Sequence, residues 1–457
     1  MPIIQKKQKP ITPARTIAFS FFCVILTGAF LLMLPISSKN GMMIPFNHAL
    51  FTATSATCVT GLVIYDTFQQ FTIFGQLVIL AMIQIGGLGL VTFITFFNFA
   101  IGKKLGLRKM QVASESVSAD GFNDARGLVK NIIKFSLAVE SIGAAILMLA
   151  FVPKYGLSGI FTSIFISVSA FCNAGFDILG INTAFSSVTE FNSNPIVLFT
   201  TMALIVFGGL GFIVWYDLKN YKIRRHLELH TKIVLIVTAI LILTGTIAFL
   251  FCEWNNNSTI GNMSLWDKIM NCAFQSVTCR TAGFNSIDII SLHPVSKVVS
   301  IILMYIGAAP GSTGGGIKVT TIAVIIMTVV SILKNKEETT ILGRKLDKSV
   351  VYKSLTIAML SMALIFVTSI AIYFSLNAKA ANTVSGLDTL FESVSAFATV
   401  GLSVGVSGIA NLFSEMLLVF LMFLGRVGPI SVILSLTILG ADKSKKQVFP
   451  EGKVMVG

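Results

Sequence analysis

Four glycines in this chain each follow a short stretch rich in serine and threonine. They are Gly61, Gly175, Gly283 and Gly401, separated by 114, 108 and 118 residues. Backbone carbonyls can replace the water around a dehydrated cation when successive C=O groups point at one axis. Glycine enters the required conformations without the penalty that a Cβ imposes. Four such loops in register predict a ring of carbonyl oxygens that binds a cation.

Each glycine ends a triplet that contains no acidic residue. The triplets are Val59-Thr60-Gly61, Asn173-Ala174-Gly175, Thr281-Ala282-Gly283 and Thr399-Val400-Gly401. Their first positions add two threonine hydroxyls and one amide to the carbonyls. A divalent ion would favour carboxylate ligands, so a monovalent ion fits this ring better.

The nearly even spacing predicts one unit of roughly a hundred residues, written four times. Composition places these units in a membrane, because 54% of residues are hydrophobic, 12% are charged and the mean hydropathy is +0.85. Apolar runs, most of them near or above the roughly 20 residues of a spanning helix, precede and follow each glycine segment. The runs cover residues 16–36, 71–101, 133–152, 196–215, 233–251, 298–306, 319–333, 355–374 and 416–439.

The glycine segments are too short and too polar to cross a bilayer, so each is interpreted as a re-entrant hairpin. Irregular backbone at membrane depth is tolerated where it lines a water-filled cavity. The predicted fold is an all-α polytopic membrane protein. It has four repeats of outer helix, pore helix with return loop, and inner helix (M1-P-M2) around a pseudo-fourfold central pore. The repeats are predicted at residues 1–110, 111–222, 223–338 and 339–457, the last with a short cytoplasmic tail.

Clusters of the basic residues behind the net charge of +14 lie between repeats or after the last. They are Lys103, Lys104, Arg108, Lys109, Lys219, Lys222, Arg224, Arg225, Lys334, Lys336, Arg344, Lys345, Lys348, Lys443, Lys445 and Lys446. Short basic loops face the cytoplasm, so both termini are predicted inside the cell and the return loops enter from outside. The clusters could also dock a cytoplasmic partner or anionic lipid. They form no continuous face for nucleic acid.

A run of small residues at 307–318 interrupts the inner helix of the third repeat. Such a run cannot hold a stable helix, so we expect a flexible gate just inside the ring. The candidate gate residues are Gly307, Pro310, Gly311, Ser312, Thr313, Gly314, Gly315, Gly316 and Lys318. Close helix packing is the alternative. A nucleotide-binding loop is excluded, because no strand precedes the run and Lys318 does not directly follow Gly316.

Arg426 lies within the inner helix of the fourth repeat. A cation at membrane depth is costly unless it is paired or faces the pore. It could bond carbonyls of the gate loop and hold it closed, or place a positive barrier on the pathway. A snorkelling arginine that only sets topology is the alternative.

Four further charges fall near the predicted pore. Arg280 and Glu392 are expected to brace adjacent loops through a buried pair. Asp177, just past the second triplet, could concentrate cations at the outer mouth or lie solvated in a loop. Glu140 falls in the outer helix of the second repeat, and its role stays open.

The six cysteines and four histidines show no metal-ligand spacing and no catalytic constellation. The sequence therefore predicts neither an enzyme nor a tightly bound cofactor. A secondary transporter of another monovalent cation is the competing class. Such transporters more often have inverted repeats and midplane carboxylates.

Over nearly its whole length the chain resembles the Trk/Ktr/HKT potassium transporters, and within that family the KtrB-type ion-translocating subunits. The motifs that carry the resemblance are Thr60-Gly61-Leu62, Asn173-Ala-Gly175-Phe176, Arg280-Thr-Ala-Gly283-Phe-Asn285, Thr399-Val-Gly401-Leu402, the segment 307–318 and Gly425-Arg426-Val-Gly-Pro429. A departure is Cys58, where a threonine would be unremarkable. In plant relatives a serine at the first filter glycine goes with sodium permeation, so Gly61 implies potassium selectivity.

The resemblance also implies how the protein works. It implies K⁺ uptake driven by the membrane potential, with K⁺ held only by the filter carbonyls and Na⁺ either coupled to uptake or activating it. It implies a homodimer in the cell membrane, among membrane lipids, on a separate cytoplasmic RCK-type (KtrA- or KtrC-like) subunit that binds ATP or ADP. The tail from Phe449 to Lys453 is similar to the family's, which packs near the dimer interface.

Overall fold

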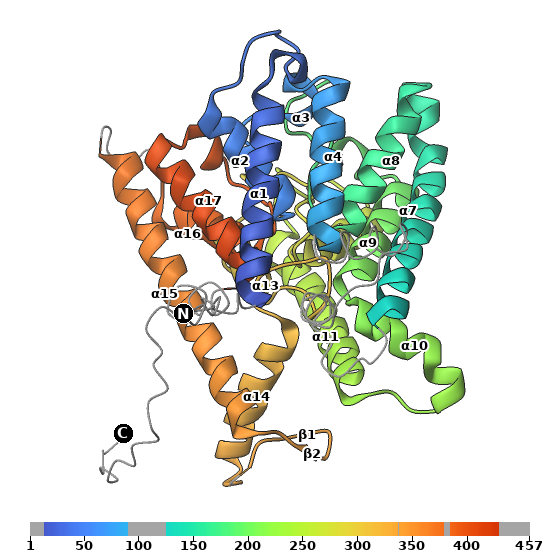
Figure 1. Ribbon diagram of the computed structural model, residues 1–457, viewed down its shortest axis with the longest axis vertical. Helices are drawn as coiled ribbons and strands as arrows, with labels where there is room; N and C mark the ends of the chain where they lie inside the picture. Colours follow the sequence, from blue (N-terminus) through green and yellow to red (C-terminus); the bar gives the residue numbers. More distant parts are fainter. Residues whose placement is uncertain (1–12, 90–124, 337, 379–383, 429–457) are drawn as a thin grey trace, which may run out of the picture.

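Helices make up nearly all of the regular structure in this computed structural model, which describes residues 13–89, 125–336, 338–378 and 384–428 (Figure 1). Within those ranges, the only sheet is a short antiparallel pair of strands, β1 (Thr340–Ile341) and β2 (Arg344–Lys345). The predicted all-α fold is therefore confirmed.

The helices fall into four groups with the same order. The first group is α1 (Pro13–Met33), α2 (Phe46–Thr57), the short α3 (Thr67–Gln70) and α4 (Ile73–Leu88). The second is α7 (Ala125–Tyr155), α8 (Ser158–Phe171), α9 (Pro195–Gly209) and α10 (Phe212–Arg224). The third is α11 (Leu229–Glu253), α12 (Leu265–Thr278), α13 (Pro294–Tyr305) and α14 (Val319–Leu333). The fourth is α15 (Lys348–Asn377), α16 (Gly386–Ala398) and α17 (Leu412–Val427). Each group begins with an outer helix, followed by a pore helix and an inner helix.

The outer and pore helices differ in length as the sequence predicts. The outer helices α1, α7, α11 and α15 are long and apolar enough to cross a membrane, with mean hydropathies of 2.1 to 2.8 over their most apolar stretches. The pore helices α2, α8, α12 and α16 have 12 to 14 residues. At 1.5 Å per residue they reach only about 20 Å, too short for a hydrocarbon core of roughly 30 Å.

Local sequence explains where the pore helices begin and which face they bury. Two of them share a capping box, in which Ser264 or Ser385 accepts from the backbone N–H of an aspartate three residues later. An equivalent phenylalanine is fully buried in every pore helix, and these are Phe51, Phe165, Phe274 and Phe391. The pore helices are thus held inside the ring of outer helices.

Among the described residues, two inner helices are broken, and only one of these breaks was expected. In the third repeat, α13 ends at Tyr305 and α14 begins at Val319, which matches the predicted interruption. The apolar run 196–215 does not form one straight span, because α9 and α10 meet at 91°. Gly211 lies at this corner with φ of +91°, a conformation that a helix cannot contain. The prediction of a single helix over 196–215 was wrong.

Polar contacts join each repeat to the next on the side of the return loops. Between repeats 1 and 2, the Phe185 N–H donates to Asp66 at 2.7 Å, and between repeats 2 and 3, Asn271 donates to the Asn192 carbonyl at 2.9 Å. Between repeats 3 and 4, Lys297 pairs with Asp388 at 3.0 Å. Between repeats 4 and 1, His48 contacts Glu415 at 3.2 Å. The first and fourth repeats are therefore neighbours, and the ring is closed.

Candidate functional site

Each pore helix ends just before its glycine triplet. The last helical residues are Thr57, Phe171, Thr278 and Ala398. The C-terminal end of a helix carries the equivalent of about half a negative charge. Four such ends directed at the triplets favour a cation among them.

The four triplets share one backbone conformation. Their first residues (Val59, Asn173, Thr281 and Thr399) have φ of 53° to 68°, and their glycines have φ of 68° to 94°. The residue between them has no positive φ. A positive φ is uncommon outside glycine, so four equivalent cases indicate strain held at a functional site. Alternation in the sign of φ turns successive carbonyls toward the same side, as a cation ring requires.

The four glycines form a closed ring with the carbonyls of the middle residues. A Cβ on Gly61 would lie 2.5 Å from the Ala174 carbonyl oxygen, and one on Gly175 would lie 2.7 Å from that of Ala282. Gly283 faces the Val400 carbonyl in the same way, and Gly401 faces that of Thr60. Each repeat thus contacts the next, and the fourth returns to the first. Glycine is required here both for its φ and for the space.

Hydroxyl groups of the pore helices hold the loops in place. The Gly61 and Gly401 N–H groups donate to Ser55 and Ser395 at 3.1 Å. In the other repeats, Ser169 donates to the Phe176 carbonyl at 2.6 Å and Thr278 to the Phe284 carbonyl at 2.8 Å. The serine and threonine content of these segments therefore fixes the backbone of the ring.

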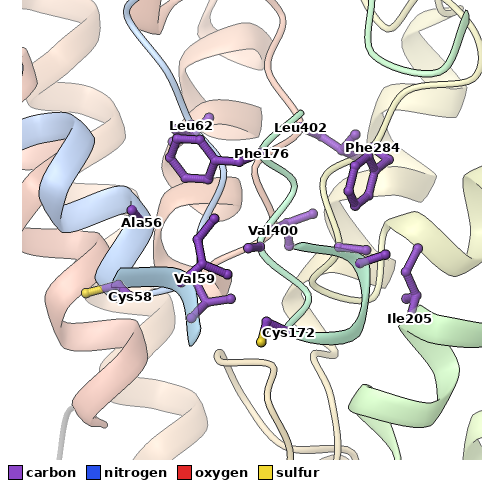
Figure 2. Packing of buried hydrophobic residues seen from close by; sticks show 14 of the residues in the cluster. Ala56, Cys58, Val59, Leu62, Cys172, Phe176, Ile205, Phe284, Val400 and Leu402 are labelled. Carbon is purple, nitrogen blue, oxygen red and sulfur yellow. The ribbon is translucent and has the colours of Figure 1, made fainter. Parts of the chain in front are cut away.

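An apolar collar surrounds the ring just past the glycines. It consists of Leu62, Phe176, Phe284 and Leu402, each at most 1% exposed. Figure 2 shows these four side chains gathered at one level, with Val400 and then Val59 below them in this view. Close packing of this kind resists changes in the width of the ring.

An outer mouth of about 310 Å³ opens directly onto the four glycines. Asp66, Asp177 and Asp288 line it, together with Asn285 and Ser403. Asp66 is committed to structure, since its two oxygens accept from the N–H groups of Gln69 and Phe185. Burial, with a smaller contribution from the nearby Asp66 carboxylate, raises the pKa of Asp177 to about 7. Asp177 thus lies at the mouth, as the sequence predicted, but as a half-buried group.

The loop 307–318 lies against the inner end of the ring. Side chains at Gly314 and Gly315 would collide with Thr281 and Thr399, the first residues of two triplets. The Gly316 N–H donates to the Gly425 carbonyl at 3.3 Å. The loop therefore packs directly beneath the third and fourth triplets.

The same loop is hydrogen-bonded to the second repeat. Thr313 donates through its N–H to the Gly208 carbonyl at 3.2 Å and through its hydroxyl to the Phe171 carbonyl at 3.1 Å. The Ala309 N–H donates to the Gly209 carbonyl at 3.0 Å. The segment thus extends from its own repeat across to the neighbouring inner helix.

Two cations hold carbonyls of this loop. Arg426 donates to the carbonyls of Thr313 and Gly86, and also to that of Gly87 at 3.3 Å. Lys318 donates to the Gly314 carbonyl at 2.7 Å and to that of Gly315 at 3.2 Å. Arg426 therefore ties the loop to the inner helix of the first repeat.

Comparisons with known proteins identify the family of this chain. The family profile described as "TrkH: Cation transport protein" matches residues 7–447. The chain belongs to the TrkH family. The resemblance inferred from the motifs is confirmed, and the family consists of cation transporters rather than enzymes.

Individual relatives cover the whole chain. Ktr system potassium uptake protein B of Bacillus subtilis (strain 168) is 37% identical over 98% of this chain and 97% of its own. Potassium/sodium uptake protein NtpJ of Enterococcus hirae is 36% identical over all of both chains. The crystal structure of the potassium transporter TrkH from Vibrio parahaemolyticus matches with a TM-score of 0.73 at 17% identity, covering 95% of this chain and 86% of that one. This last match supports the fold.

Sequence reasoning singled out Gly425 but missed that it belongs to a second set of equivalent glycines in this TrkH-family chain. Gly86, Gly208 and Gly425 pack against the carbonyls of Thr57, Phe171 and Phe397, each four residues before a ring glycine. The third repeat has its break instead, beginning at Gly307. A repeated sequence motif could have revealed these glycines, because Gly-Gly-Leu-Gly occurs at both 86–89 and 208–211 and the similar Gly-Arg-Val-Gly occurs at 425–428. The last glycine of each motif has φ of 83° to 92°.

The predicted pair between Arg280 and Glu392 was wrong. Glu392 accepts hydrogen bonds from its own return loop, from Ser403, Val404 and Ser407. Arg280 instead donates to the Thr238 carbonyl of α11 at 3.4 Å. Glu140 is bound by Gln84 of α4 at 3.1 Å, which joins the second repeat to the first. These three charges brace the scaffold around the ring.

Several predicted features lie outside the described residues. They are the basic residues Lys103, Lys104, Arg108, Lys109, Lys443, Lys445 and Lys446, Pro429, and the tail from Phe449 to Lys453.

Proposed function

We propose that this protein mediates potassium uptake across the cell membrane through the four-loop ring. The observation that carries the proposal is the cyclic packing of each ring glycine against a carbonyl of the next repeat. The names of the relatives from B. subtilis and E. hirae, which state potassium uptake and potassium/sodium uptake, support the choice of ion. Movement is channel-like and driven by the membrane potential. A secondary transporter of another monovalent cation is the alternative.

In this proposal the backbone of four triplets is the selectivity filter. Its residues are Val59, Thr60, Gly61, Asn173, Ala174, Gly175, Thr281, Ala282, Gly283, Thr399, Val400 and Gly401. Carbonyl oxygens replace the hydration shell of K⁺, and the apolar collar limits adjustment of the ring around smaller ions. The predicted repeat boundaries after residues 110, 222 and 338 place one triplet in each unit.

The gate of this filter is the loop 307–318 held by Arg426. The supporting observations are its position at the inner end of the ring, its hydrogen bonds to the second and fourth repeats, and its link through Arg426 to the first repeat. Conduction requires this loop to move, and its small residues make such motion sterically easy.

The membrane orientation follows from the charges. The helix α10, the lower part of α14 and the strands β1 and β2 lie at the end of the molecule opposite α2 and α3 (Figure 1). Basic residues gather at this end, among them Lys219, Lys222, Lys334, Lys336 and Lys345. The positive-inside rule makes this the cytoplasmic end, with both termini inside.

The protein works with other subunits in this proposal. The name of the B. subtilis relative describes it as one protein of a system. A homodimer surrounded by membrane lipids, with a cytoplasmic RCK-type subunit that binds ATP or ADP, is the assembly that the family resemblance implies. Sodium, named for the E. hirae relative, acts as an activator or a coupled ion.

Uptake of radioactive rubidium into proteoliposomes tests the proposed function. With an inward-negative potential, we expect accumulation that unlabelled potassium suppresses at far lower concentration than sodium does. Empty liposomes are the control. Absence of cation uptake, with and without the cytoplasmic subunit, would contradict the proposal.

External pH should alter uptake through Asp177. Because its pKa is raised to about 7, the carboxylate is mostly neutral at pH 6 and mostly ionised at pH 8. One charge about 8 Å from a cation contributes about 0.5 kcal/mol in water, so the apparent KM for rubidium should fall about twofold as external pH rises over this range. Initial rates measured at several concentrations give this value.

Asp177→Asn should remove most of this pH dependence. Its apparent KM for rubidium should stay at the higher value that the wild type has at pH 6. The matched control is Asp288→Asn, which removes a charge from the same mouth and should leave the pH dependence in place. A pH profile that is unchanged in Asp177→Asn would show that another group titrates.

A further inference from the structure

A groove lies where α7 meets α10, at the proposed cytoplasmic end of the helices. Its volume is about 360 Å³, and its walls include Lys134, Phe135, Trp215, Tyr216 and Lys219. The corner between α9 and α10 creates it, because α10 leaves the axis of α9 at 91°. Figure 1 shows α10 beside the lower end of α7. Its lining also includes Phe212, whose backbone N–H donates to the Gly311 carbonyl of the loop 307–318 at 2.9 Å.

The charges of this groove are of one sign. Lys134 and Lys219 are both exposed, and neither forms an ion pair in the described part of the chain. The groove lining contains no acidic residue. Asp217, the nearest acid along α10, is buried and accepts from the Glu228 N–H at 2.9 Å. Two ammonium groups are therefore available to an anion.

Aromatic side chains form the floor of the groove. Trp215 donates from its indole to the Phe207 carbonyl at 2.9 Å. Its ring lies 5.1 Å from the rings of both Phe135 and Phe207. Tryptophan and tyrosine are enriched where the hydrocarbon core meets the headgroups. Trp215 thus marks the depth of the membrane interface.

A second, apolar groove lies further along α7 toward the membrane centre. It has a volume of about 270 Å³ and lies between α7 and α9. Its lining includes Val139, Ile142, Ile146, Ala203 and Phe207. From Lys134 to Ile146 the helix rises about 18 Å, slightly more than half of the roughly 30 Å hydrocarbon core. This length matches an acyl chain of one leaflet.

We propose that these two grooves bind one anionic glycerophospholipid of the cytoplasmic leaflet. Its headgroup phosphate lies between Lys134 and Lys219, its glycerol region packs on Trp215, and an acyl chain follows α7 toward Ile146. Basic pockets between membrane helices on the cytoplasmic side bind such headgroups. The inference uses the proposed orientation in the membrane but not the ion that is transported.

Fluorescence quenching of Trp215 tests the proposal. The chain has three tryptophans, so Trp254→Phe and Trp266→Phe leave Trp215 as the only one while keeping an aromatic ring at the other two sites. The protein is reconstituted with phosphatidylglycerol or phosphatidylcholine carrying brominated acyl chains. We expect brominated phosphatidylglycerol to quench Trp215 at a mole fraction on the order of 25-fold lower than brominated phosphatidylcholine, since each of the two lysines adds about a factor of five.

The double variant Lys134→Ala/Lys219→Ala should lose this preference. The control pair Lys222→Ala/Lys336→Ala removes two exposed cations that lie at the same end of the molecule but outside the groove. This variant should keep the preference for phosphatidylglycerol. Lys134→Gln/Lys219→Gln is the second test variant, and a single symmetric peak in size-exclusion chromatography confirms that each variant is folded.

Three results would overturn the proposal. The first is equal quenching by both lipids, or a preference that survives in both lysine variants. The second is competition by glycerol phosphate as effective as that of the lipid, which would indicate a site for a free anion. The third is a Trp215 that neither lipid quenches, as a groove covered by a second copy of the chain would give.

Discussion

Gly61→Ser is expected to reduce the preference for potassium over sodium at least tenfold. The new Cβ would lie 2.5 Å from the Ala174 carbonyl oxygen, so this carbonyl must move away from the axis. A side chain at φ of +92° adds strain of about 1–3 kcal/mol. A difference of about 1.4 kcal/mol between two ions already changes their ratio tenfold. The measurement is rubidium uptake in proteoliposomes with sodium and potassium as competitors.

Gly41→Ser is the matched control for this variant. Gly41 also has a positive φ, +64°, but no atom lies within 4 Å of the position where its Cβ would be. It therefore carries the backbone strain without the collision, and its selectivity should equal that of the wild type. If Gly61→Ser is well folded and still selects potassium as the wild type does, the ring does not set selectivity.

Arg426→Gln is expected to raise uptake several-fold in liposomes that contain this chain alone. The arginine bonds the Thr313 carbonyl of the gate loop and the Gly86 carbonyl of the first repeat. Hydrogen bonds from a charged group contribute about 1.5–3 kcal/mol each, so their loss shifts the loop toward conformations that open the inner end of the ring. Initial rates over a range of rubidium concentrations measure the effect.

Arg426→Lys distinguishes two roles for the arginine: holding the gate loop closed through hydrogen bonds, or repelling cations on the pathway by its charge. Lysine keeps the charge, but its single ammonium does not reproduce the fork that reaches two carbonyl groups. If the arginine pins the loop, uptake rises in both variants. If it acts as a barrier, uptake rises only in Arg426→Gln. Unchanged uptake in both variants at every concentration would contradict any gating role.

Local requirements explain which parts of the site could be predicted. Each ring glycine follows a short helix that contains serine and threonine, and its positive φ penalises a Cβ whatever surrounds it. The run 307–318 likewise breaks a helix by composition. These features depend on the backbone of a few consecutive residues, so they are visible in the sequence.

Packing between repeats explains the errors. Glu392 could have paired with Arg280 by charge, but the return loop of its own repeat offers it four hydrogen-bond donors. The run 196–215 is apolar throughout, and hydropathy does not register the positive φ of Gly211. Gly86, Gly208 and Gly425 matter because another backbone lies against them, which no single segment reveals.

The sequence by itself determined the membrane location, the four repeats, the ring glycines and the broken third inner helix. Hydropathy, period and the steric demands of glycine are properties of the chain alone. Only the tertiary structure decided that each glycine meets the carbonyl of the following repeat, that Arg426 reaches both Thr313 and Gly86, and that α10 turns away to form a groove with α7. Those contacts join residues more than a hundred positions apart or depend on the angle between helices, and close packing of the folded repeats sets both.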